Sequence, residues 1–209
     1  MKFTNPSRRL ATAFAGGLAL LLMAASVEAD DLPFGQPRIA YSGVTVTEVA
    51  GQTMETRVYY MPGHQRNEID MGTGEQVMLL DFERQVSYML MPAEKVYMEM
   101  PMGAHGMGAF APEDDPEGKV EHEVLGRETI DGQSTTKYRF EVTTPEGSSK
   151  GLVWVTDDGI LMRSESETTT GADDQAPGRV VITLKDLRIG PQDPALFELP
   201  ADYHKMDLN

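Results

Sequence analysis

The residues that could carry out catalysis do not combine into a recognisable active site. Residues 147–151 match the Gly-x-Ser-x-Gly pattern of serine hydrolases, but that pattern works only where a sharp turn between a strand and a helix presents the serine. We expect a hairpin loop between two strands here, with no helix after it, so we interpret the match as a coincidence. The chain has no cysteine and its four histidines lie far apart, which disfavours a thiol nucleophile or a zinc site. We therefore expect a protein that is not an enzyme and carries no cofactor.

A short methionine-rich segment offers a different chemistry, the binding of a soft metal ion. Met98, Met100, Met102 and Met107 lie close to His105 in the sequence. Thioether sulfur suits Cu(I), and imidazole nitrogen is a further ligand for copper. Because an exported protein can encounter such ions, one hypothesis is that these five residues bind Cu(I) or Ag(I).

Methionine and aromatic side chains could instead form an apolar binding surface. Most of the 14 methionines lie between residues 54 and 107, in runs that predict β-strands. Methionine adapts to irregular apolar ligands, and aromatic rings supply large apolar areas. The residues that we expect on such a wall are Met89, Met91, Met98, Met100, Tyr138, Phe140 and Trp154. A filled protein core would use the same residue types, so both interpretations stay open.

The elements that position these side chains are predicted to be β-strands. In the clearest run, Tyr138 and Phe140 alternate with Lys137 and Arg139, a period of two that is typical of a strand with one buried face. Roughly ten antiparallel strands in one domain must curve or close. The predicted runs are 41–49, 53–61, 65–71, 76–81, 85–91, 95–100, 120–130, 136–144, 150–156, 160–168 and 179–188.

Two segments depart from this β pattern. Residues 101–118 are rich in glycine and proline, and we expect them to form a long flexible loop. Near the C-terminus, Asp193 is a good N-cap and Pro194 suits the first helical position. A short helical turn is therefore predicted from Asp193 to about Phe197, before Pro200 stops it.

The N-terminal residues and the overall charge indicate an exported protein. Basic residues precede an apolar stretch at residues 10–25, and residues 27–29 supply a plausible cleavage site, which is the pattern of a secretory signal. We expect residues 1–29 to be removed and residues 30–209 to form one domain in the periplasm. The net charge of −15 disfavours nucleic acid as a partner. The mature protein is expected to be soluble, with transient membrane contact at most.

Several motifs, taken in order, resemble a known superfamily. They are Leu-Gly-Arg-Glu-Thr-Ile-Asp-Gly at 125–132, Thr-Lys-Tyr at 136–138, Trp-Val-Thr-Asp-Asp-Gly at 154–159, and the ending at 193–203. Together they resemble periplasmic proteins of the LolA/LolB-like lipoprotein-carrier superfamily, and in particular its DUF4412-type branch. The resemblance implies a strongly curved antiparallel sheet that forms an open, incomplete β-barrel. Its concave side would hold acyl chains.

The sequence departs from that superfamily in two respects. Lipoprotein carriers of this kind have a basic residue just before the proline that ends the second strand, whereas Met61 precedes Pro62 here. Arg66 lies a few residues on and could take that role. The lid helices of a carrier are also not visible in the sequence.

Three hypotheses for function follow. The leading one is a non-enzymatic periplasmic carrier that holds a lipid, an acyl chain or a lipidated protein in a concave β-sheet. The second is the Cu(I) or Ag(I) module described above. The third is an acidic interaction domain that docks on a basic partner and binds no small ligand.

Overall fold

A computed structural model of the chain describes residues 35–70, 72, 74–102, 119–144, 147–170 and 178–206. The expected signal at residues 1–29 lies outside the described residues, and so does the expected loop, except at its start. Pro101 belongs to a strand, and the amide of Met102 donates to the carbonyl of Gln85 at 2.8 Å. None of the helices in the described part is long and apolar enough to cross a membrane.

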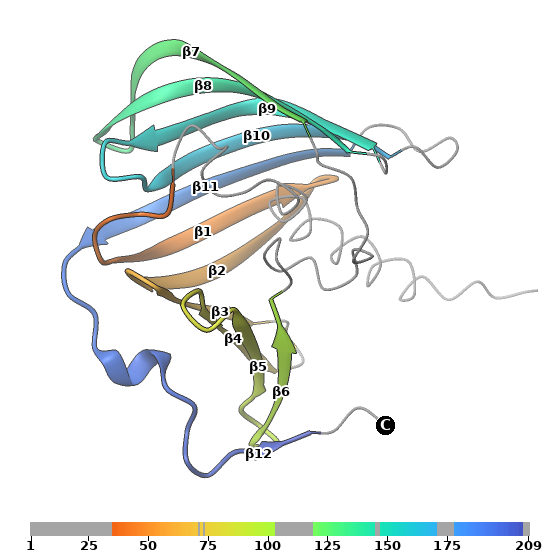
Figure 1. Ribbon diagram of the computed structural model, residues 1–209, viewed down its shortest axis with the longest axis vertical. Helices are drawn as coiled ribbons and strands as arrows, with labels where there is room; N and C mark the ends of the chain where they lie inside the picture. Colours follow the sequence, from red (N-terminus) through yellow and green to blue (C-terminus); the bar gives the residue numbers. More distant parts are fainter. Residues whose placement is uncertain are drawn as a thin grey trace, which may run out of the picture.

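Twelve strands form a single sheet in the described part of the chain (Figure 1). Their order across the sheet is β12-β6-β5-β4-β3-β2-β1-β11-β10-β9-β8-β7, and all pairs are antiparallel except β12 with β6. The strands are β1 (Tyr41–Val49), β2 (Gln52–Met61), β3 (His64–Asp70), β4 (Glu75–Asp81), β5 (Val86–Met91), β6 (Val96–Pro101), β7 (Lys119–Ile130), β8 (Gln133–Thr144), β9 (Gly147–Thr156), β10 (Leu161–Thr170), β11 (Gly178–Ile189) and β12 (His204–Lys205).

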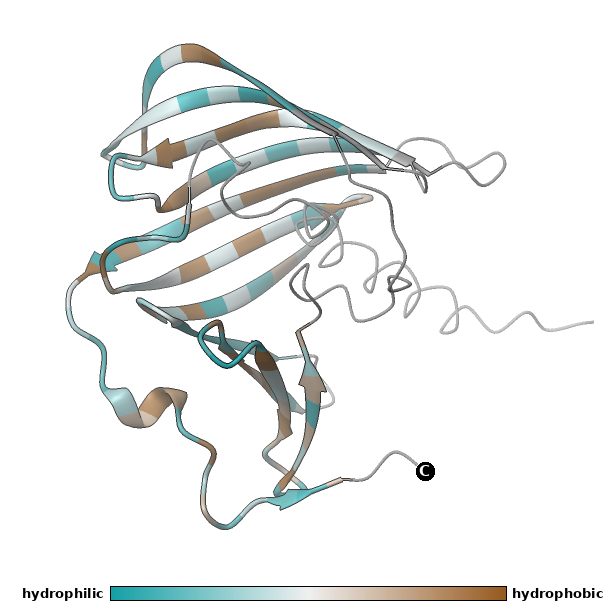
Figure 2. Cartoon of the chain, viewed as in Figure 1, coloured by the Kyte–Doolittle hydropathy of each residue, from teal (hydrophilic) through white to brown (hydrophobic). Residues whose placement is uncertain are grey.

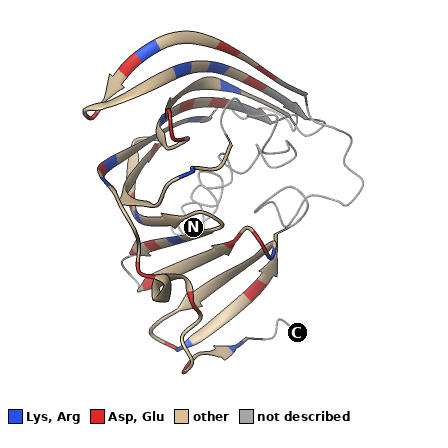
Figure 3. Ribbon diagram, turned by 60° about the vertical axis from the view of Figure 1, so that its left-hand side comes forward, with Lys and Arg blue, Asp and Glu red and all other residues tan. Residues whose placement is uncertain are grey.

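The sheet is strongly curved and does not close. Its two edges are β7 and β12, and these two strands do not pair with each other. Figure 3 shows the resulting bend, with β7–β10 on one side and β3–β6 on the other. The expected all-β architecture with an open, curved antiparallel sheet is therefore confirmed.

The strand prediction is also confirmed closely. The run at 41–49 coincides with β1, and the run at 53–61 differs from β2 only at its first residue. Asp131 and Gly132 have φ values of 47° and 77°, as expected for a turn between β7 and β8 in which both central residues take positive φ. β12 was not predicted, because two residues are too few to show alternation.

The predicted helical turn is present as the 3-10 helix η2 (Pro194–Phe197). The carboxylate of Asp193 accepts a hydrogen bond from the amide of Ala195, and Pro194 occupies the start of the helix. This N-cap satisfies a backbone amide that the helix leaves unpaired. The prediction of this element from Asp193 and Pro194 is confirmed.

The register identifies the two faces of the sheet, because directly paired residues point to the same side. We call the face with Tyr60 the inner face and the face with Trp154 the outer face. Figure 2 shows apolar and polar residues alternating along the strands, as two unlike faces require. A cluster of buried residues packs on the inner side: Tyr41, Val58, Tyr60, Ile160, Met162 and Leu184.

The segment that precedes β1 covers one end of this inner cluster. The Tyr60 hydroxyl donates to the carbonyl of Pro37 at 2.8 Å, and the Arg38 amide donates to the carbonyl of Asp158 at 2.9 Å. Tyr41 stacks on Tyr60 with ring centroids 5.4 Å apart. Burial raises the pKa of both phenols above the ordinary value, so both rings stay neutral core residues.

One glycine allows an unusually close approach of two strands. A Cβ atom on Gly151 of β9 would lie 2.0 Å from the carbonyl oxygen of Glu165 in β10. Because no side chain fits in that space, glycine is required where these two strands approach each other. This contact lies between β9 and β10.

Candidate functional site

Strands β4, β5 and β6 carry a wall of methionines on their inner face. Met78 lies directly opposite Met89, and Met89 lies directly opposite Met98. Met91 and Met100 follow on the same face by alternation. We call these five residues the methionine wall: Met78, Met89, Met91, Met98 and Met100. All five are half-buried, so thioether surface remains open on this face.

The outer face of the same three strands is covered. Val77, Leu79 and Leu90 are 2%, 3% and 1% exposed, and they form a cluster with Leu199 and Tyr203 from the C-terminal segment. Figure 1 shows this segment running along the outside of the bend to β12. The strands are thus packed from behind, and the methionine wall is the face that the C-terminal segment leaves uncovered.

Arg66 helps to hold the C-terminal segment in place. Its Nη1 donates to the carbonyl of Leu196 at 3.0 Å, and its Nε donates to Glu68 at 2.7 Å. His64, on the same face of β3, contacts Phe197 with ring centroids 6.1 Å apart. The Arg66 side chain therefore lies on the outer face, opposite to the face that carries the methionine wall.

Six of the seven residues expected on the apolar wall share the inner face. Tyr138 pairs with Val153, and Phe140 pairs with Gly151, so both rings point to the side that the four methionines of the expected wall occupy farther along the sheet. The two groups come from opposite halves of the sheet. The structure brings together the four methionines and keeps the two aromatic residues apart from them.

Trp154 differs from the other six, because it lies on the outer face. It pairs with Lys137 and Arg163, and both cations lie over its ring, at 4.8 and 5.8 Å from the centroid. Its Nε1 donates to Glu128 at 2.7 Å, and the residue is 4% exposed. Trp154 is a buried structural residue here, and we leave it out of the wall.

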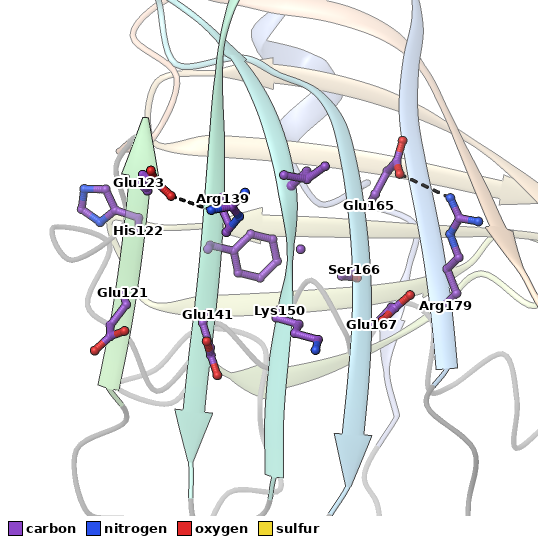
Figure 4. A pocket seen from close by; sticks show the side chains of 13 residues that line it. Glu121, His122, Glu123, Arg139, Glu141, Lys150, Glu165, Ser166, Glu167 and Arg179 are labelled. Atoms are coloured by element: carbon purple, nitrogen blue, oxygen red, sulfur yellow. Dashed lines mark hydrogen bonds and ion pairs between the residues drawn. The ribbon is translucent and has the colours of Figure 1, made fainter. Parts of the chain in front are cut away.

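The outer face of β7–β11 holds an open groove of about 550 Å³ (Figure 4). Nine of its thirteen lining residues form two rows across the strands, and the residues of each row are directly paired; the other four, His122, Phe140, Gly151 and Ser166, belong to the row between them, whose side chains are on the inner face. One row is Glu121, Glu141, Lys150, Glu167 and Arg179, and the other is Glu123, Arg139, Leu152 and Glu165. Charges of both signs therefore lie on this face, although the directly paired Glu121 and Glu141 are both acidic.

Two ion pairs bridge neighbouring strands in this groove. Arg139 of β8 contacts Glu123 of β7 at 2.6 Å, and Arg179 of β11 contacts Glu165 of β10 at 3.3 Å. Glu165 also contacts Arg163 of its own strand at 2.7 Å. The hydrogen bonds from Arg163 lower the pKa of Glu165, and those from Lys137 and Trp154 lower the pKa of Glu128. Such paired charges suit a solvated outer surface. Sequence reasoning did not identify this groove, since its residues come from five strands.

Three of the five residues expected to bind a soft metal lie in the described part of the chain. Met98 and Met100 share the inner face of β6, and Met102 is buried at 5% exposure. His105 and Met107 lie outside the described residues. Within the described part of the chain, no group of three or more His, Cys, Asp or Glu side chains could hold a metal ion. The Gly-x-Ser-x-Gly match at 147–151 lies within β9 and not in a hairpin loop, so the expected loop was wrong; no helix follows the serine in β9 or β10.

The comparison with known families identifies the chain. A family model described as "Domain of unknown function (DUF4412)" matches residues 44–165, more than half of the sequence. The chain belongs to this family. The matched region of the DUF4412 domain spans β1 to the first half of β10, and so includes the whole methionine wall. Membership in the wider lipoprotein-carrier superfamily stays a prediction.

Solved structures show what the DUF4412 domain is similar to. An uncharacterized conserved protein from Thermus thermophilus is 10% identical, with a TM-score of 0.53 over 90% of this chain and 98% of that chain. A chain in the complex structure of Pseudomonas aeruginosa MucA/MucB is 11% identical, with a TM-score of 0.39 over 88% of this chain and 62% of that chain. The Thermus structure supports the fold alone. Among curated proteins, none matches this sequence.

Proposed function

We propose that this protein is a non-enzymatic binding protein of the periplasm that holds an apolar ligand against the methionine wall. The ligand class is a lipid, an acyl chain or the acyl group of a lipidated protein. One observation carries the proposal: β4–β6 carry large apolar side chains on both faces, but the C-terminal segment packs only on the outer one. The half-buried thioethers on the inner face are then available to a guest molecule.

The wall has the chemistry that an acyl chain requires. Met78, Met89 and Met98 are in register across three strands, so their side chains form a continuous apolar strip. Each has three flexible bonds and a polarizable sulfur, which lets the strip adapt to a flexible chain. Burying one such side chain contributes about 1.5–3 kcal/mol, so a few contacts support reversible binding.

The rest of the surface supports release of a ligand. The chain carries a net charge of −15, and a negative surface is repelled by anionic lipid headgroups. A carrier with an apolar wall and an acidic exterior would contact such a membrane briefly and not stay on it. This agrees with the expectation of transient membrane contact.

The test uses two double variants of the same pair of residues. Met89→Leu with Met98→Leu keeps the wall apolar, whereas Met89→Gln with Met98→Gln makes it polar at similar size. A fluorescent fatty acid is titrated into each purified protein. We expect the Leu pair to bind like the wild type. The Gln pair should bind about tenfold more weakly, since losing about 60 Å² of apolar contact costs about 1.5 kcal/mol.

A matched control lies on the other side of the sheet. Thr53 is an exposed residue of β2 on the outer face, and Thr53→Gln should leave the affinity unchanged. The proposal is wrong if the wild type binds no fatty acid. It is also wrong if the Gln pair, folded as judged by circular dichroism, binds as tightly as the Leu pair.

A further inference from the structure

We propose that the sulfur atoms of Met78, Met89 and Met98, together with Met100, form a binding site for a soft monovalent metal ion, Cu(I) or Ag(I). This goes beyond the proposed function, because it concerns a second class of ligand that needs the sulfur atoms and not only the apolar surface. It also differs from the site expected within residues 98–107, because two of its ligands come from other strands.

The register brings the thioethers within reach of one ion. Directly opposite residues on one face of an antiparallel pair have Cβ atoms about 4.5–5.5 Å apart. Met89 has such a partner on each side, Met78 in β4 and Met98 in β6. Because each methionine side chain has three rotatable bonds, the three sulfurs can turn toward a shared point above Met89.

Met100 supplies a fourth sulfur from the same strand as Met98. It is two residues farther along β6, so its side chain lies on the same face, and it pairs with Ser87. Both Met98 and Met100 are half-buried. A site with three or four thioethers, partly shielded but open to solution on one side, results from this arrangement.

The surroundings determine which metal the site would select. Its neighbours in the register are neutral: Asn67 is opposite Met78, and Ser87 is opposite Met100. In the described part of the chain, no group of three His, Cys, Asp or Glu residues could hold a metal ion. Neutral sulfur ligands without carboxylate or imidazole favour Cu(I) over hard divalent ions, and Ag(I) shares that preference for soft ligands.

The structure separates this site from the linear methionine motif. Met102 is 5% exposed, and its amide extends the hydrogen-bonded ladder of β5 and β6 through Gln85. It is thus more deeply buried than the wall, whereas Met89 is half-buried at the centre of the row. Met89 is therefore the residue whose loss should weaken metal binding most.

The experiment is an Ag(I) titration of the full chain, labelled with ¹³C at the methionine methyl groups and followed by NMR. Ag(I) is redox-inert and reports on the same soft ligands. We expect the methyl signals of Met78, Met89, Met98 and Met100 to shift together and to saturate at one equivalent. Met89→Leu should weaken the affinity by at least the roughly tenfold cost of losing an outer-shell partner at a metal site.

The control variant is Met54→Leu. Met54 is half-buried in β2 and pairs with Thr47, so it has no methionine directly opposite it in β1. Its substitution should leave the Ag(I) affinity unchanged. The inference is overturned if Met89→Leu and Met54→Leu have equal effects, or if the signals of all methionines shift gradually without saturation.

The fatty-acid test and the Ag(I) test can fail independently. The pair Met89→Leu and Met98→Leu removes two sulfurs and keeps an apolar wall, so it should lose Ag(I) binding and retain the fatty acid. Retention of Ag(I) by this pair would refute the metal site and leave the apolar function intact. Loss of Ag(I) by the Leu pair, in a protein whose wild type binds no fatty acid, would support the metal site alone.

Discussion

The two halves of the sheet use the same strand alternation for different purposes. In β4–β6 both faces carry large apolar side chains, and the C-terminal segment packs on those of the outer face. In β8–β10 the outer face carries rows of paired charges, and the inner face carries Tyr138, Phe140 and Val153. A strand with two apolar faces needs apolar groups packed on both faces. A strand with one charged face needs them on the other face only, because water solvates the charges.

This difference indicates where a ligand would bind. The charged groups on the outer face of β8–β10 are already solvated or paired with charges on neighbouring strands. The methionine wall on β4–β6 is apolar and half-buried, and the segment that packs on these strands lies on their other side. The contrast can be tested by substitutions, beginning with the one that should have the largest effect.

Replacing a covered outer-face residue should be the most damaging change. Leu90 is 1% exposed beneath the C-terminal segment, so Leu90→Ala should lower the free energy of unfolding by about 2–5 kcal/mol. Leu152 is the apolar residue of the charged rows and is only half-buried. Leu152→Ala should therefore cost much less when both variants are unfolded in urea. Equal losses would remove the contrast between the halves.

A smaller loss is expected where β9 and β10 approach most closely. Gly151→Ala would place Cβ against the backbone of Glu165, and we expect it to cost about 1–3 kcal/mol, as other overpacking changes do. Gly178→Ala is the control, since nothing lies within 4 Å of a Cβ there. Thermal unfolding compares the two. A neutral Gly151→Ala would contradict the close strand contact.

The indole of Trp154 should matter less, because its partner is partly exposed. Trp154→Phe removes the hydrogen bond to Glu128 and should destabilise the protein by about 1–2 kcal/mol. Glu128→Gln retains an acceptor for the indole N–H and should cost less, as measured by urea unfolding. If Glu128→Gln were the more harmful change, the ion pair with Lys137 and not the indole bond would hold this part of the sheet.

The weakest expected effect is a dependence on pH in the charged half. Hydrogen bonds from Arg163 lower the pKa of Glu165 below the ordinary value of 4.5. The unfolded chain therefore takes up a proton first as the pH falls, and the stabilisation that is present above pH 4.5 is lost as the pH falls through the folded pKa. Glu165→Gln should flatten the decline in stability below that pH. An unchanged pH profile would show that this carboxylate does not contribute.

Most of the fold follows from local sequence. Alternation in Tyr138 and Phe140, turn pairs such as Asp131-Gly132, and the cap at Asp193 predict elements that the structure confirms. The curvature follows from the number of strands. These features depend on neighbouring residues, so a single sequence contains the information.

The arrangement across strands could not be predicted in the same way. Alternation tells which residues share a face within one strand, but the alignment of Met78 with Met89 and Met98 depends on the register between strands. The cover of β4–β6 includes Tyr203, which lies near the far end of the chain. Trp154 was grouped with the wall because it is a large apolar residue, although its strand places it on the opposite side.

The most direct test of the account is to locate a bound fatty acid on the protein. A fatty acid with a nitroxide group on its chain is added to the protein labelled at the methionine methyl groups, and the broadening of each NMR signal is measured. The account predicts strong broadening of Met78, Met89 and Met98, and little at Met61 on the outer face of β2. Equal broadening of all four signals, or none, would contradict it.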